Sequence, residues 1–105
     1  MDTQHGGLFN AQGREGAVLD ENKRIWVVME VLRASALMQR DDVYGQRAKN
    51  LFGDLLSLFV THYIDPRTGY WHEVLHRDLT PQTDYMPGTT PYHIYPVLCE
   101  INQLI

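Results

Sequence analysis

The fold is decided by the stretch Lys23-Arg-Ile-Trp-Val-Val-Met-Glu-Val-Leu-Arg33, which begins a largely apolar segment. Because apolar residues lie nearly all round this segment, we expect a buried helix over about residues 21–39. Trp26, Glu30 and Arg33 stand at positions i, i+4 and i+7 and therefore share one face of that helix. An acid and a base on a buried helix need a partner, so this face is a candidate ligand-binding surface. The alternative is a structural role, with Trp26 as an aromatic core residue and Glu30 paired with Arg33 or Arg24.

A second helix is expected over about residues 43–63, after the polar break at Arg40-Asp41-Asp42. Its apolar residues recur at steps of three and four and fall on one side. They are Tyr44, Ala48, Leu51, Phe52, Leu55, Phe59 and Tyr63. An all-round apolar helix followed by a one-faced helix predicts an α/α hairpin with an inner and an outer layer, and a mainly all-α fold.

The stretch Met86-Pro-Gly-Thr-Thr-Pro-Tyr-His-Ile94 places a histidine at the start of a third predicted helix, at about residues 93–105. Thr90 is a good N-cap, and the ring of Pro91 fixes the φ angle of residue 91 near the helical value. The helix dipole disfavours an imidazolium, so we predict a neutral His93 that can accept a proton. The alternative is a histidine of the capping region that satisfies backbone carbonyls. Pro96 should start or kink the last helix.

Short β excursions are expected around these helices, at a Gly-rich hairpin or loop over residues 5–18 and at a strand over residues 70–75. Trp71 in that strand suits either stacking on a sugar ring or a place in the core. His72-Glu73-Val74-Leu75-His76 matches the H-E-x-x-H motif of zinc-dependent hydrolases, in which two helical histidines bind the metal and the glutamate activates water. That chemistry needs a helix, so the alternative is an exposed strand with both histidines on one face.

The composition points to one small domain, with 105 residues, of which 44% are hydrophobic and 21% charged. The net charge of −4 and only two lysines exclude a basic stripe for nucleic acid and a polybasic membrane patch. Cys99 is the single cysteine, and no secretory leader precedes the first predicted element. We therefore expect a cytoplasmic protein without a metal or other cofactor, and a small sugar remains a candidate ligand.

Four motifs in order along the chain resemble the C-terminal portion of the N-acylglucosamine 2-epimerase superfamily, which includes cellobiose 2-epimerases and mannose isomerases. They are His5-Gly-Gly-Leu-Phe9, Asp20-Glu-Asn-Lys-Arg-Ile-Trp26 with Glu30, Asp65-Pro-Arg-Thr-Gly-Tyr-Trp71, and Pro91-Tyr-His93. The resemblance implies part of an (α/α)6 toroid that binds a sugar at its axis, where two histidines shuttle a proton at C2. His93 resembles the C-terminal catalytic histidine. Trp26, Glu30 and Arg33, together with Trp71, are the implied substrate-binding residues.

The chain also departs from the family pattern. The second catalytic histidine belongs to an H-x-x-E segment that has no equivalent in these residues. The chain has Trp26-Val-Val-Met-Glu30 where W-P-Q-A-E is usual, and Ile94-Tyr-Pro-Val97 where an arginine is usual. We therefore expect a single partial domain over residues 1–105, a truncated module that is incomplete or inactive alone. The alternative is a non-catalytic binding remnant. Both predict an uncovered apolar flank, and hence a homo-oligomer or a complementing chain.

Overall fold

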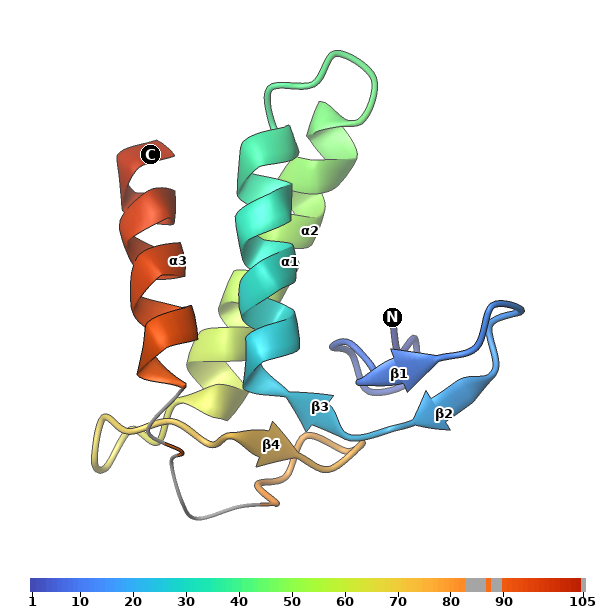
Figure 1. Cartoon of the computed structure of the whole chain (residues 1–105), viewed down its shortest axis with the longest axis vertical. Coiled ribbons are helices and arrows are strands. Elements are labelled where there is room, and N and C mark those ends of the chain that lie inside the picture. The colour runs from blue at the N-terminus through green and yellow to red at the C-terminus, as the bar shows by residue number, and fades with distance from the viewer. Residues whose placement is uncertain (83–86, 88–89, 105) are drawn as a thin grey trace.

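The computed structural model describes residues 1–82, 87 and 90–104 of the chain. The fold is mainly helical, with short strands beneath one end of the helices (Figure 1). The helices are α1 (Ile25–Met38), α2 (Gly45–Leu58), which continues as a π-helical turn η1 (Phe59–Tyr63), and α3 (Pro91–Leu104). The strands are β1 (Ala11–Gln12), β2 (Val18–Asp20), β3 (Lys23–Arg24) and β4 (Val74–Leu75).

Helix α1 lies at the centre and packs against both α2 and α3. Figure 1 shows that α1 and α3 begin at the same end of the molecule and run side by side in the same direction, whereas α2 returns antiparallel to them. The α/α hairpin predicted from the apolar periodicity is therefore confirmed, and α3 adds a second helix to the layer of α1. This order of inner, outer and inner helix is the repeating arrangement of an α/α toroid.

The core lies between the three helices and the strand layer, by which we mean β3, β4 and the residues next to them in sequence. Helix α1 supplies its largest share because its apolar residues recur on more than one face. The buried residues of the core are Ile25, Val28, Met29, Leu32, Ala36, Leu55, Phe59, Tyr63, Leu75, Ile94, Val97 and Ile101. Burial on the remaining face of α1 is incomplete, since Trp26 is 40% exposed and Leu37 is 50% exposed.

The helix ends differ from the sequence-based expectation for identifiable reasons. α1 begins at Ile25 rather than near residue 21, because Lys23 and Arg24 pair with Leu75 and Val74 as an antiparallel two-stranded sheet. α3 begins at Pro91, directly after Thr90, whose carbonyl accepts a hydrogen bond from the Ile94 amide at 3.1 Å. Pro96 lies inside α3 rather than at its start. Residue 105, the expected last residue of this helix, lies outside the described residues.

The predicted hairpin is present, although the strands are shorter than expected. β1 pairs antiparallel with β2. In the Asp65–Gly69 turn the Asp65 carbonyl accepts hydrogen bonds from the amides of Thr68 and Gly69, and Gly69 has a φ of 76°. Of the strand expected over residues 70–75, only β4 forms, and isolated bridges join Trp71 to Ile64 and Leu75 to Pro81. Between β4 and α3 the structure describes the chain only outside residues 83–86 and 88–89.

A fully buried lysine fastens the N-terminal segment to the strand layer. The Lys23 ammonium donates hydrogen bonds to the Asp2 carboxylate at 2.8 Å, to the Arg77 carbonyl at 2.8 Å, and to the Gly6 carbonyl. Hydrogen bonds from Lys23, and further ones from the Gln4 amide and the Arg77 side chain, hold the pKa of Asp2 well below its ordinary value. Because the ammonium has three acceptors, its burial is compensated.

Candidate functional site

The predicted face of α1 is present and lies partly open to solvent. Trp26, Glu30 and Arg33 follow one another along the helix. The Glu30 and Arg33 side chains are 45% and 41% exposed, and they approach each other to 4.0 Å. The expectation of a buried acid and base is therefore wrong in its degree of burial: the face is half-buried, so both charges keep contact with water.

An ion pair connects this face to α3. Arg33 Nε donates to Glu100 Oε2 at 2.6 Å. Trp26 lies seven residues before Arg33, and His93 lies seven residues before Glu100. Seven residues are about two helical turns, or about 10 Å along the axis. Because α1 and α3 run in the same direction, Trp26 and His93 both lie about two turns before the ion pair, toward the end at which the two helices begin.

His93 stands in the first turn of α3 with an exposed side chain. Its backbone amide donates to the Thr90 carbonyl at 2.9 Å, which fixes the first turn. An exposed imidazole is a suitable group for proton transfer to a polar ligand. We define the α1–α3 face by Trp26, Glu30, Arg33, His93 and Glu100, which include four of the five predicted site residues. Ion pairs join Arg33 to Glu30 and to Glu100, whereas Trp26 and His93 are assigned to this face by their positions along the two helices.

Trp71, the fifth predicted residue, lies on a different element. Its backbone bridges to Ile64 after η1, and its side chain packs against the hydrophobic core. Its indole Nε1 is buried without a hydrogen-bond partner in the described part of the chain. The place in the core, which was one of the two interpretations of this residue, describes its surroundings.

The zinc-hydrolase interpretation is wrong, because residues 72–76 are extended and not helical. Two histidines four residues apart bind one zinc ion when they lie on adjacent turns of a helix, whereas in an extended segment they are about 13 Å apart, too far to bind one ion. Glu73 is buried and accepts a hydrogen bond from the Thr90 hydroxyl, so it is not free to activate water at this place. Among residues 1–82, 87 and 90–104, no three His, Cys, Asp or Glu side chains form a group that could hold a metal ion.

Sequence reasoning missed two features of the site. Glu100 could have been found, because its seven-residue spacing from His93 puts both on one helix face. The buried contact between Glu73 and Thr90 had no such signal, since the two residues are far apart in sequence and belong to different elements.

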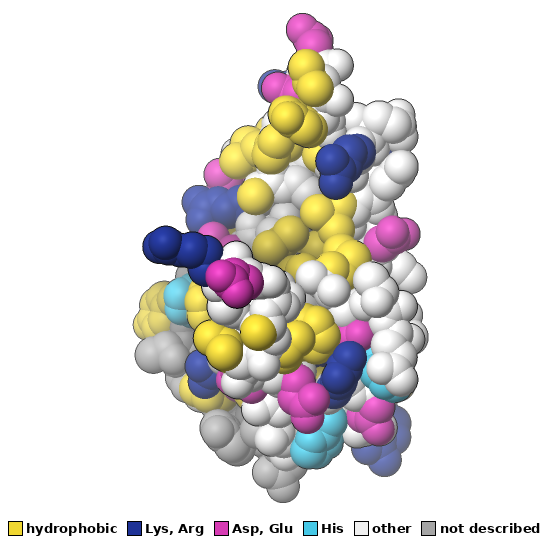
Figure 2. Space-filling view, turned by 90° about the vertical axis from the view of Figure 1, so that its right-hand side faces the viewer, with side chains coloured by type: hydrophobic (Ala, Val, Ile, Leu, Met, Phe, Trp, Pro, Cys, Tyr) yellow, Lys and Arg dark blue, Asp and Glu magenta, His cyan; other side chains and the backbone are white. Residues whose placement is uncertain are grey.

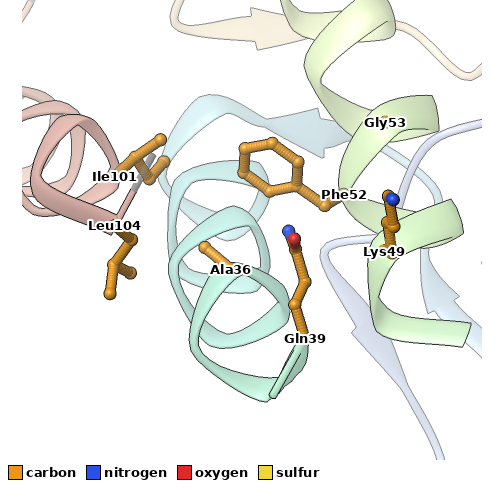
Figure 3. A pocket seen from close by; sticks show the side chains of 7 residues that line it. All are labelled: Ala36, Gln39, Lys49, Phe52, Gly53, Ile101 and Leu104. Atoms are coloured by element: carbon orange, nitrogen blue, oxygen red, sulfur yellow. The ribbon is translucent and has the colours of Figure 1, made fainter. Parts of the chain in front are cut away.

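Two largely apolar hollows flank the helices, away from the α1–α3 face. The first, of about 290 Å³, lies where the last turns of α1 and α3 meet α2 (Figure 3). Its lining residues are Ala36, Gln39, Lys49, Phe52, Gly53, Ile101 and Leu104. The second, of about 610 Å³, lies between α1 and α2 and includes Val31, Ala34, Met38, Tyr44 and Leu51. On the face that Figure 2 presents, hydrophobic side chains form a broken band between Lys and Arg side chains.

The order of inner, outer and inner helix is that of part of an α/α-toroid protein. A sequence profile of the N-acylglucosamine 2-epimerase (GlcNAc 2-epimerase) family matches residues 1–97, and the chain belongs to this family. No curated protein sequence matches it significantly. None of the described helices is long and apolar enough to cross a lipid bilayer.

Solved structures of similar fold carry the names of sugar isomerases and epimerases. The first is a D-mannose isomerase, with a TM-score of 0.88 and 24% identity, and the match covers 99% of this chain and 27% of that one. Cellobiose 2-epimerase from Bacillus thermoamylovorans B4167 follows, with a TM-score of 0.84, 18% identity, and 98% and 29% coverage. Cellobiose 2-epimerase from Spirochaeta thermophila DSM 6192 has a TM-score of 0.84, 20% identity, and 98% and 28% coverage. The chain therefore spans less than a third of each of these proteins.

Proposed function

We propose that this chain supplies one part of a sugar 2-epimerase or aldose–ketose isomerase site, in which His93 transfers a proton at C2 of the sugar. The proposal is supported by the arrangement of α1 and α3, which run in the same direction and are joined by the ion pair of Arg33 and Glu100. Trp26 and His93 each lie seven residues before a member of this pair. Membership of the family makes sugar chemistry the first hypothesis for such a face.

The chemistry requires a base beside a carbon that lies next to a carbonyl. In the open-chain form of an aldose, the C2 proton is acidic because its removal gives an enediolate stabilised by the C1 oxygen. In the proposed reaction the neutral imidazole of His93 takes this proton. Return of a proton to the opposite face of C2 gives the epimer, whereas protonation of C1, with transfer of the C2 hydroxyl proton to the C1 oxygen, gives the ketose. Trp26 would pack against the apolar face of the sugar, and Glu30 and Arg33 would bind hydroxyl groups.

The second half of the machinery has to come from other residues. The family carries a second histidine on an H-x-x-E segment, which the chain lacks. We propose that the site is completed by a complementing polypeptide or by another copy of the chain. The two hollows support this, because apolar hollows beside an inner helix are places where neighbouring helices of a toroid would pack. On this proposal the chain alone is incomplete or inactive.

The experiment that tests catalysis is exchange of the C2 proton in D₂O, followed by NMR with mannose, glucose and N-acetylglucosamine. We expect exchange in the completed assembly and its loss in His93→Ala. The matched control is His76→Ala, which removes an exposed histidine that follows β4. Exchange that survives His93→Ala, or that falls equally in His76→Ala, would contradict the role of His93.

Association is tested by light scattering on the purified chain. Ala34 is exposed and lines the larger hollow, so Ala34→Glu places a charge where an apolar neighbour is expected. We expect an assembly in the wild type that this variant weakens. Asn50→Glu, which adds the same charge at another exposed position, should leave the mass unchanged. A wild-type chain that stays monomeric and well folded as its concentration is raised would refute association with itself.

A non-catalytic binding role is the second candidate. It is favoured by the two departures from the family pattern, because Val28 and Ile94 are apolar and buried in the core instead of adding polar groups to the face. In that case the chain would assemble, and no sugar would exchange its C2 proton.

A further inference from the structure

Glu73 and Thr90 form a buried contact that none of the steps above uses. Only 7% of Glu73 and 4% of Thr90 are exposed. The Thr90 hydroxyl donates to Glu73 Oε2 at 2.6 Å, the length typical of a bond from a hydroxyl to a carboxylate. Because a buried carboxyl group without a partner is strongly disfavoured, this bond is a requirement of the fold at this place.

The same two residues connect the beginnings of both inner helices. The Glu73 carbonyl accepts a hydrogen bond from the amide of Ile25, the first residue of α1, at 3.0 Å. The Thr90 carbonyl accepts from the amides of His93 at 2.9 Å and Ile94 at 3.1 Å. One residue of the strand layer therefore holds the start of α1 through its backbone and the start of α3 through its side chain.

This arrangement bears on His93 because that residue lies in the first turn after Thr90. A shift or fraying of this turn would move the imidazole relative to Trp26, which is fixed near the start of α1. Displacements of about 1 Å reduce proton-transfer rates strongly. None of the contacts described above joins Glu73 to the α1–α3 face, and its effect on His93 passes through Thr90.

We propose that Glu73 is a positioning residue, which through the Thr90 hydroxyl fixes the first turn of α3 and so the place of His93 beside α1. The geometric part of this inference stands on the hydrogen bonds alone, and its catalytic consequence rests on the proposed function. The role also replaces the one that the zinc interpretation gave to the glutamate of the H-E-x-x-H sequence.

The first test is amide hydrogen exchange in Thr90→Val, which replaces the hydroxyl by a methyl group of similar size. We expect the His93 and Ile94 amides to exchange about tenfold faster, since a hydrogen bond to a charged group is lost. Leu32 in the core of α1 should keep its rate within about twofold. Thr90→Ser, which keeps the hydroxyl, should restore the wild-type rates at His93 and Ile94. Glu73→Gln, which keeps an acceptor without the charge, should give an intermediate acceleration.

The outcomes separate positioning from general stabilisation. Unchanged rates at His93 and Ile94 in Thr90→Val would overturn the proposal, and so would an equal acceleration at Leu32. If Thr90→Val does not fold, Glu73→Gln decides in the same way: a selective acceleration at His93 and Ile94 supports positioning, and a uniform or absent one overturns it.

A second readout depends on catalysis. In an assembly that exchanges C2 protons, Thr90→Val should lower kcat about tenfold or more with KM nearly unchanged, and Thr90→Ser should restore it. A rise in KM alone would overturn the catalytic part. If the completed assembly of the wild type shows no exchange, the proposed function fails for these sugars, while the amide exchange still decides whether Glu73 and Thr90 fix the first turn of α3.

Discussion

Two glycines in α2 should respond to the same substitution with opposite signs. An ideal Cβ on Gly53 would have no neighbouring atom within 4 Å. An ideal Cβ on Gly45 would lie 2.6 Å from the Gln39 carbonyl oxygen and 3.3 Å from its carbon. Both residues belong to the same helix, so the difference between them isolates the space around the added methyl group.

The magnitudes follow from helix propensity and from the contact. Gly53→Ala should stabilise the chain by about 1 kcal/mol, because alanine restricts the unfolded chain and costs nothing in an open helical position. For a domain of this size that corresponds to a rise of about 4–8 °C in Tm. Gly45→Ala should destabilise it by about 1–3 kcal/mol, because the methyl group can be accommodated only if the backbone between α1 and α2 moves.

Urea unfolding followed by circular dichroism measures both effects. The measurement should be repeated at two protein concentrations, because Gly53 lines the smaller hollow and association would make the apparent stability depend on concentration. The two positions are about 12 Å apart along the helix, so the double variant should be close to the sum of the single ones. A Gly45→Ala variant as stable as the wild type, or a Gly53→Ala variant less stable than it, would refute the reasoning.

Three further outcomes are expected. The Tyr63 ring is fully buried, and its hydroxyl donates to the Lys23 carbonyl at 3.0 Å, so Tyr63→Phe should lower the free energy of unfolding by about 1–2 kcal/mol. The control is Tyr70→Phe at a 63% exposed residue, which should change the free energy of unfolding by less than about 0.5 kcal/mol. The pKa of Asp2 in the folded chain lies below its ordinary value of 3.8, so its contribution to the free energy of unfolding is complete above that pH and is lost as the pH falls toward the folded pKa. Asp2→Asn should therefore be less stable than the wild type at neutral pH. In urea titrations it should also lose less stability than the wild type below about pH 4. The side chains of Arg33 and Glu100 are 41% and 36% exposed, so a double-mutant cycle with Arg33→Gln and Glu100→Gln should give a coupling energy of only about 0.2–1 kcal/mol. This coupling energy should shrink in high salt, and one that salt does not change would contradict the prediction.

The helical hairpin could be predicted because its signal is local. The three- and four-residue steps from Ala48 to Tyr63 and the apolar residues around Trp26 both report on single helices, and α1 and α2 formed where these patterns lie. For the same reason the spacing of Trp26, Glu30 and Arg33 was sufficient to put them on one face. The start of α1 was misplaced because a strand pairing with residues 74–75 competes with helix formation at Lys23 and Arg24.

The parts that escaped prediction depend on residues far apart in the chain. Nothing in the sequence around Lys23 indicates that its ammonium is buried against Asp2 and the Arg77 carbonyl. Likewise, the H-E-x-x-H match gave Glu73 a role in metal chemistry, whereas the partner that determines its role is Thr90. Local patterns carry no information on such contacts, so the polar part of the strand layer becomes visible only in the folded structure.

The contacts of the strand layer have a consequence for the order of folding. The bond from Arg77 to Asp2 joins residues 75 positions apart, and that from Lys23 to the Arg77 carbonyl joins residues 54 apart. Contacts within the hairpin of α1 and α2 span far shorter stretches and close with a smaller loss of chain entropy. We therefore expect the hairpin to form early and the two bonds of Arg77, with Asp2 and Lys23, to form late. A chain that is still being synthesised can bury the inner face of α1 before the strand layer beneath it has closed.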